Sequence, residues 1–219
     1  MLLAIDTSAG TDVAVVTEGG RLRGRYRLDD GRRHAEAIGI GIHRALGEAG
    51  VQPRHITGVV CGMGPGPFTG LRVGVAAARA FAFAQGVPLH PVASHDAIAH
   101  EWRRDHPDEH GPLLVTTDAR RRELAASRYA PGGLRAEPQP VDGADGAAAP
   151  FVLVRPDDAE ALAAGEGRIR VAATGVSAER LALAWLDGEQ AGLAPVADEI
   201  LYLRAPDAKP GAVPKRVTA

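Results

Sequence analysis

A turn rich in glycine and proline, placed between an apolar segment and an alanine-rich one, constrains the fold of this chain most. It reads Gly-Pro-Gly-Pro-Phe-Thr-Gly-Leu-Arg-Val-Gly over residues 64–74. The apolar run at 56–60 predicts a buried strand, and the run at 75–85 predicts a helix that stops at Gly86. A turn of this kind lets the backbone pass close to another group and aims free N–H groups at it, which suits an anion.

The common phosphate-binding loops do not match this turn. Its spacing differs from Gly-x-x-x-x-Gly-Lys-Ser/Thr, and the only lysines, Lys209 and Lys215, lie far along the chain. Nor does it open a first βα turn as Gly-x-Gly-x-x-Gly. We therefore expect neither an ordinary P-loop nor a dinucleotide site.

Composition narrows the class of protein. The 219 residues carry a formal net charge of −2, which gives no overall electrostatic case for nucleic acid. The single cysteine, Cys61, allows neither a disulfide framework nor a thiolate zinc site. No stretch resembles a signal peptide or reaches the length of a membrane span, so we expect a soluble cytoplasmic protein with no membrane partner.

Two segments of the chain begin in the same way. An apolar strand at 2–5 ends at Asp6, and a second one at 113–117 ends at Asp118. Each is followed by a short turn, a return strand and a pair of glycines. The repeated pattern suggests an internal duplication of one structural unit.

The remaining pattern fills out these two halves. An amphipathic helix is predicted at 33–49, and Ser94 is expected to cap a short helix at 96–102. Segment 131–150 is rich in alanine, glycine and proline, which predicts a mobile excursion. The expected organisation is an N-terminal lobe, a C-terminal lobe and an extended or disordered tail, at residues 1–108, 109–203 and 204–219.

The aspartates that end the two strands are candidates for a ligand site. Such carboxylates can hold a metal–phosphate complex between two lobes, so the candidate residues of a vestigial nucleotide site are Asp6, Thr7, Ser8 and Asp118. The alternative is a turn in which each aspartate hydrogen-bonds its own backbone. Residues 120–122 are all arginine and could pair with phosphate or a partner's acids, or form a solvated turn.

The other residue types form no catalytic or metal-binding constellation. His95 and His100 stand five residues apart, whereas a helical metal pair needs a spacing of three or four. His106 and His110 have that spacing but flank Pro107 in a polar connection. No Gly-x-Ser-x-Gly elbow is present, and the cysteine lacks the setting of an activated thiol. We expect no metal and no catalytic residue in this chain.

Small residues recur along the helix that follows the turn. Gly70, Gly74 and Ala78 lie four apart on one face, and the earlier helix contains Gly39 and Gly41. Small residues at this spacing let two helix backbones approach closely. The two helices either pack within the chain or form an interface between subunits, and we favour the interface.

The turn resembles the signature of the bacterial TsaB (YeaZ) family, the dimerisation subunit of the tRNA adenosine threonylcarbamoyltransferase complex. Further matches in order along the chain are Leu3-Ala4-Ile5-Asp6-Thr7-Ser8, His34-Ala35-Glu36, Asp118-Ala119-Arg120 and Tyr202-Leu203-Arg204. Their combination is more specific than any single piece. Ala35 and Pro67 depart from the pattern, since the family more often has serine there.

The resemblance implies a two-lobed α/β fold of the actin/Hsp70/sugar-kinase (ribonuclease H-like) type, duplicated, with mixed sheets flanked by helices. It also implies a heterodimer with a catalytic, TsaD-like paralogue, or a homodimer of the chain alone, through the helices at 33–49 and 70–85. The interface residues expected from it are His34, Glu36, Ile38, Gly39, Ile42, Gly70, Leu71, Gly74 and Ala78.

In the paralogue, a His-x-x-x-His metal pair follows the glycine-rich helix. Ser94 and Ile98 occupy those two positions here, and His95 is out of phase by one residue. The resemblance therefore agrees with the spacing argument that this chain does not bind the catalytic metal.

By this resemblance the chain is a non-catalytic scaffold required for threonylcarbamoyladenosine formation at position 37 of ANN-decoding tRNA. No cofactor is expected on this chain alone, whereas ATP and Mg²⁺, a TsaE-like ATPase subunit and the tRNA are expected in the complex. The main alternative is an ATP-dependent phosphotransferase or ATPase that acts on its own through Asp6 and Asp118. A peptidase lacks a nucleophile, and a bare tRNA-binding module lacks an overall basic charge.

Overall fold

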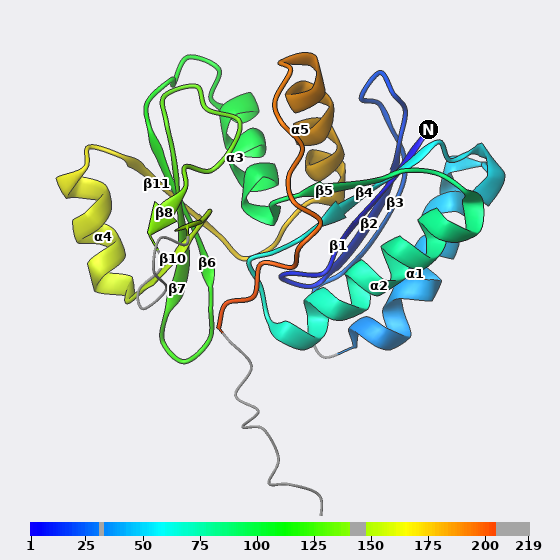
Figure 1. The fold of residues 1–219 in the computed structure, drawn as a ribbon, viewed down its shortest axis with the longest axis horizontal. Helices are drawn as coiled ribbons and strands as arrows, with labels where there is room; N and C mark the ends of the chain where they lie inside the picture. Colours follow the sequence, from blue (N-terminus) through cyan, green and yellow to red (C-terminus); the bar gives the residue numbers. More distant parts are fainter. Residues whose placement is uncertain (31–32, 141–147, 205–219) are drawn as a thin grey trace, which may run out of the picture.

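The computed structural model describes residues 1–30, 33–140 and 148–204. Two sheets stand next to each other, and two helices, α3 (Ser94–Asp105) and α5 (Ala178–Gln190), pack between them (Figure 1). The tail expected from residue 204 onward lies outside the described residues except for its first residue, as does the middle of the expected excursion at 131–150. In the described part of that excursion, β8 (Gln139–Pro140) pairs with β9 (Ala148–Ala149).

The first sheet joins an antiparallel meander to a parallel half, with the strand order β3-β2-β1-β4-β5. Its strands are β1 (Leu2–Asp6), β2 (Thr11–Val16), β3 (Leu22–Leu28), β4 (Gly58–Gly62) and β5 (Leu89–Val92). Strands β1, β2 and β4 are buried along their whole length because helices cover both faces of the sheet. The outer face is covered by α1 (His34–Ala49) and α2 (Phe68–Gln85), and each of these ends at a left-handed glycine.

The second sheet repeats the plan of the first, with the order β10-β7-β6-β11. Its strands are β6 (Leu113–Asp118), β7 (Leu124–Tyr129), β10 (Val152–Val154) and β11 (Ile169–Ala173). In both sheets the first strand pairs antiparallel with the second and parallel with the strand that follows a helix, here α4 (Pro156–Gly165). This shared topology confirms the internal duplication.

The two halves of the chain exchange helices across the middle of the molecule. Helix α5, which follows the second sheet, packs on β1, β2, β4 and β5 of the first sheet. Helix α3, which precedes the second sheet, packs on α5 and on β6 and β11. The expected boundary between residues 108 and 109 falls in the connection between α3 and β6. Both lobes therefore share one central core, which includes Ile98, Leu113 and Leu181.

Two helices begin at residues other than those expected from the sequence. The helix at 33–49 is confirmed as α1, but α2 already begins at Phe68, inside the glycine-rich motif. Ser94 is the first residue of α3 and not its cap, because its hydroxyl bonds Asp6 and the backbone of Gly64. Among the described residues, no helix is both long and apolar enough to cross a membrane.

Candidate functional site

The first hairpin turn, residues 6–10 between β1 and β2, is anchored by buried hydrogen bonds to the Asp6 carboxylate. Asp6 is 2% exposed, and its carboxylate accepts hydrogen bonds from Ser8 N (2.8 Å), the Ser8 hydroxyl (2.6 Å) and the Ser94 hydroxyl (2.6 Å). Burial raises the pKa of Asp6, and the hydrogen bonds from Ser8 and Ser94 oppose that rise. The bond to Ser8 N is the turn-forming contact that the sequence offered as an alternative to ligand binding.

Glycines of the glycine-rich motif let α2 pack closely on this turn. A Cβ at Gly74 would overlap the Thr7 hydroxyl, and one at Gly70 would lie 2.7 Å from His34 Nε2. The Thr7 hydroxyl donates instead to the carbonyl of Gly70 at 2.8 Å. The small residues of α2 therefore face Thr7 and α1 of the same chain.

This packing involves several residues of the interface expected from the sequence, and that interface stays a prediction. Six of the residues expected at it are buried within this chain: His34, Ile38, Gly70, Leu71, Gly74 and Ala78. Ile42 is half-buried against the core, whereas Glu36 and Gly39 are exposed. The α2 residues among the six are buried because α2 is rotated so that its face of small residues, which permits close helix contact, meets α1 and β1.

The second hairpin turn, residues 118–123 between β6 and β7, is open to solvent. The Asp118 side chain is 65% exposed, and its carboxylate accepts the backbone N–H of Arg120 at 2.9 Å. It also lies 3.7 Å from the Arg120 guanidinium. Arg120, Arg121 and Arg122 all have positive φ angles between 55° and 63°, a left-handed backbone that residues other than glycine adopt at a cost.

Two consecutive residues at the start of α3 connect the two turns. The Ser94 hydroxyl donates to Asp6 in the first lobe and accepts the N–H of Gly64 at 3.0 Å. Next to it, the His95 ring bonds the hydroxyls of Thr117 and Ser127 in the second lobe, each at 2.8 Å. Burial lowers the pKa of His95 to about 3, so its ring is neutral at physiological pH. Two adjacent residues of α3 therefore hold the base of both turns.

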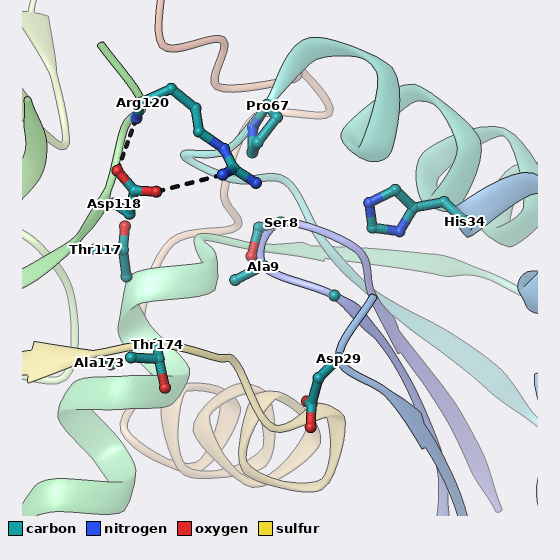
Figure 2. Close-up of a pocket in the computed structure, with 11 residues that line it drawn as sticks. Ser8, Ala9, Asp29, His34, Pro67, Thr117, Asp118, Arg120, Ala173 and Thr174 are labelled. Carbon is teal, nitrogen blue, oxygen red and sulfur yellow. Dashed lines mark hydrogen bonds and ion pairs between the residues drawn. The ribbon is translucent and has the colours of Figure 1, made fainter. Parts of the chain in front are cut away.

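A cavity of about 270 Å³ lies between the two turns (Figure 2). Its lining residues are Ser8, Ala9, Gly10, Asp29, His34, Pro67, Thr117, Asp118, Arg120, Ala173 and Thr174. Of the expected nucleotide-site residues, Ser8 and Asp118 line it, while Asp6 and Thr7 point into the protein. The cavity is at the small end for a ligand pocket and mixes two acids, Asp29 and Asp118, with Arg120 and His34.

The remaining candidates for chemistry are occupied by structural contacts. Within residues 1–30, 33–140 and 148–204, no three His, Cys, Asp or Glu side chains gather in a way that could hold a metal ion. His100 bonds Asp187 at 2.9 Å, and His106 bonds the carbonyl of Trp102 at 2.8 Å. Cys61 is buried, and burial raises the pKa of its thiol far above the usual value.

A second feature is the outer helical face, which we define as the exposed residues of α1 and α2 that point away from the first sheet. Two large apolar side chains stand on it, Ile40 at 51% and Phe83 at 90% exposure. Small exposed residues accompany them, including Gly39, Ala76 and Ala80. Sequence reasoning missed Ile40 and Phe83, although the helical period puts both out of phase with the buried positions of their helices.

Comparisons with known proteins agree with this fold. A family model described as TsaD, tRNA N6-adenosine threonylcarbamoyltransferase, matches residues 29–166. An uncharacterized protein of Mycobacterium bovis is 36% identical over 214 residues, which make up 97% of this chain and 95% of that protein. A tRNA N6-adenosine threonylcarbamoyltransferase of Enterococcus faecalis is 35% identical over 108 residues, which cover 42% of this chain and 31% of that enzyme.

Solved structures give the same result for the whole fold. A Pseudomonas aeruginosa protein described as similar to peptidase YEAZ has a TM-score of 0.69 at 23% identity, covering 93% of this chain and 99% of that one. YeaZ from Pseudomonas aeruginosa has a TM-score of 0.64, also at 23% identity, covering 87% of this chain and 92% of that one. The two-lobed α/β fold and the likeness to YeaZ proteins that the motifs predict are confirmed.

Proposed function

This chain belongs to the family of the tRNA N6-adenosine threonylcarbamoyltransferase (TsaD) model, and we propose that it serves that tRNA modification as a non-catalytic scaffold in the cytoplasm. Its partner is a catalytic, TsaD-like paralogue, or a second copy of the chain when the paralogue is absent. The paralogue transfers the threonylcarbamoyl group to adenosine 37 of ANN-decoding tRNA. A TsaE-like ATPase subunit, with ATP and Mg²⁺, joins at the level of the complex.

The observation that carries this proposal is the outer helical face. Phe83 is 90% exposed near the end of α2, and Ile40 is 51% exposed on the adjacent α1. The two arginines of this side of α2 are engaged within the chain, since Arg72 bonds Tyr202 and Arg79 pairs with Asp198. On α1, Glu36, Arg44 and Glu48 are also exposed, so the face combines two large apolar side chains with charged ones. Such a surface suits a helix-on-helix contact with another subunit.

The occupied state of Asp6 supports the non-catalytic part of the proposal. Its carboxylate accepts three hydrogen bonds from Ser8 and Ser94, so turning toward a ligand would leave buried donors without acceptors. The matching Asp118 is exposed but already accepts a backbone N–H and lies beside Arg120. Neither aspartate is poised as a free metal ligand.

The test is co-purification with the paralogue after Ile40→Asp and Phe83→Asp are introduced together. A carboxylate buried in an apolar contact carries a large desolvation cost, so we expect the complex to be lost. The matched control is Ala161→Asp on the exposed side of α4, which adds a charge to the other lobe and should leave co-purification unchanged. Unfolding curves of the free variants should match the wild type. If the double variant still co-purified with the paralogue, the outer helical face would be excluded as the interface.

The cavity between the turns favours one second candidate, an ATP-dependent phosphotransferase or ATPase. Ser8 lines it from the first lobe and Asp118 and Arg120 from the second, so a phosphate group in it would meet side chains of both lobes. Titration calorimetry of the isolated chain with Mg-ATP decides between the candidates. Tight binding with turnover, lost in Asp118→Asn, would favour the enzyme over the scaffold.

A further inference from the structure

A surface cluster of two aromatic rings and one arginine stands at the start of α2. The rings of Phe68 and Tyr202 lie 4.9 Å apart at an angle of 31°. The Arg72 guanidinium sits 3.7 Å above the Phe68 ring, and its Nε donates to the Tyr202 hydroxyl at 2.9 Å. Arg72 thus covers one face of the Phe68 ring, and the residue is still 39% exposed, which leaves part of the cluster open to a ligand.

The C-terminal segment places this cluster next to the second hairpin turn. Tyr202 pairs with Gly66 as an isolated bridge, and Leu201 N donates to the carbonyl of Met63 at 2.7 Å. Two residues later, Arg204 donates to the carbonyl of Ala119 at 3.2 Å and pairs with Glu123. In Figure 1, the β6–β7 turn, the end of the coloured trace and the start of α2 meet along the lower edge of the molecule.

Along this edge the arginines at 72, 120–122 and 204 outnumber the acids Asp118 and Glu123, although the whole chain carries −2. Arg120, Arg121 and Arg122 project from three successive left-handed residues, and all three are exposed. Asp118 lies beside Arg120, but Arg122 has no hydrogen-bond or ion-pair partner among the described residues. The N-termini of α1 and α2 also open here, since His34 and Pro67 line the same cavity as Arg120, and helix N-termini favour anions.

We propose that this surface, the arginine–aromatic edge formed by Phe68, Arg72, Tyr202 and residues 120–122, binds a single-stranded segment of RNA. A base stacks on the exposed part of Phe68, and the arginines of the turn contact the neighbouring phosphates. Exposed rings beside arginines are the usual means of holding unpaired nucleotides, because every base has a π-face and every linkage has a charge.

An acidic protein segment fits this edge less well. It would use the arginines but would have no need for a ring surface that Arg72 and Tyr202 hold in place. The identity of the RNA as tRNA rests on the proposed function, whereas RNA binding by the free chain does not require a partner subunit. The two proposals can therefore fail separately.

The experiment measures binding of a fluorescein-labelled transcript of an ANN-decoding tRNA to the full chain by anisotropy, over a series of salt concentrations. The charge variant is Arg121→Asn with Arg122→Asn, because asparagine tolerates the left-handed backbone. Its matched control is Arg23→Asn with Arg54→Asn, two exposed arginines at the opposite end of the first sheet. The stacking variant is Phe68→Leu, which keeps an apolar side chain.

We expect the charge variant to weaken binding about tenfold at low salt and to reduce the slope of log K against log salt by about 1.4, which is about 0.7 for each of the two charges removed. Phe68→Leu should weaken binding about fivefold and leave the slope unchanged, since stacking releases no counterions. The control should match the wild type.

Three results would overturn the proposal. One is the absence of tRNA binding by the wild-type chain at low salt, and another is an equal loss in the control pair. The third is unchanged tRNA binding in both edge variants while co-purification with the paralogue is lost, which would assign the edge to a protein contact.

Discussion

The two hairpin turns arise from the same strand–aspartate–turn–strand pattern but have opposite environments. Asp6 is buried, and its carboxylate is held by Ser8 and by Ser94 from α3. Asp118, at the matching place in the second lobe, is 65% exposed and followed by three arginines. The first turn is thus part of the core, while the second presents its side chains to solvent. A duplicated unit has kept its geometry in both lobes and changed what its aspartate does.

The largest expected effect comes from removing the Asp6 carboxylate, and the same substitution at Asp118 is its comparison. Asp6→Ala leaves the Ser8 and Ser94 donors buried without an acceptor, so we expect a loss of about 3 kcal/mol in unfolding free energy. Asp118→Ala should change it by less than about 0.5 kcal/mol, because the side chain is exposed. Urea unfolding measures both. Similar losses for the two variants would refute the contrast between buried and open turns.

Glycine substitutions on the two helices next to the first turn test its close packing. Gly74→Ala places a methyl group against the Thr7 hydroxyl, and we expect it to destabilise the chain by about 2 kcal/mol. Gly39→Ala on α1 meets nothing within 4 Å and should stabilise the chain by about 1 kcal/mol, because alanine favours a helix. Thermal unfolding should move the two midpoints in opposite directions, and a stabilising Gly74→Ala would contradict the packing.

The pH dependence of stability tests the link from α3 to the second lobe. The pKa of His95 is lowered to about 3 from 6.5, so the unfolded chain binds its proton more readily than the folded one. The contribution of this neutral ring is complete above pH 6.5 and is lost as pH falls toward 3, by up to about 1.4 kcal/mol per pH unit. His95→Gln should remove this part of the slope in urea unfolding between pH 4 and 7.

The control for that measurement is His43→Gln on the exposed side of α1. It leaves the buried ring of His95 in place and should therefore keep the slope that His95 contributes. If His95→Gln also kept the full slope, the ring would not be held neutral by burial between Thr117 and Ser127.

The smallest expected effect concerns the backbone of the second turn. Arg122 has φ 63°, which glycine adopts without the crowding that a Cβ brings. Arg122→Gly should therefore stabilise the chain by about 0.5 kcal/mol, the relief of local strain being partly offset by the freedom that glycine gives the unfolded state. A destabilised variant in thermal unfolding would show that the Arg122 side chain contributes to the fold.

Much of the fold could be predicted from residues that are neighbours in the sequence. The helix at 33–49, the strand before the glycine-rich motif and the repeated opening of the two halves follow from periodicity and turn residues. The candidate site was harder to predict. Ser8 and Asp118 do line the cavity, but Asp6 and Thr7 do not, and nothing local distinguishes a turn that points outward from one anchored by α3.

The sequence by itself determined the strand–turn–helix unit around residues 64–74, the duplication and the ends of two helices at Gly50 and Gly86, because these depend on a few adjacent side chains. Only the tertiary structure decided that Gly70 and Gly74 face inward, that Ser94 bonds Asp6 across 88 residues, and that Arg72 bonds Tyr202 across 130 residues. These contacts depend on the rotation of α2, on the position of α3 and on the path of the chain after α5. All three are settled by the packing of the whole core, which no local pattern records.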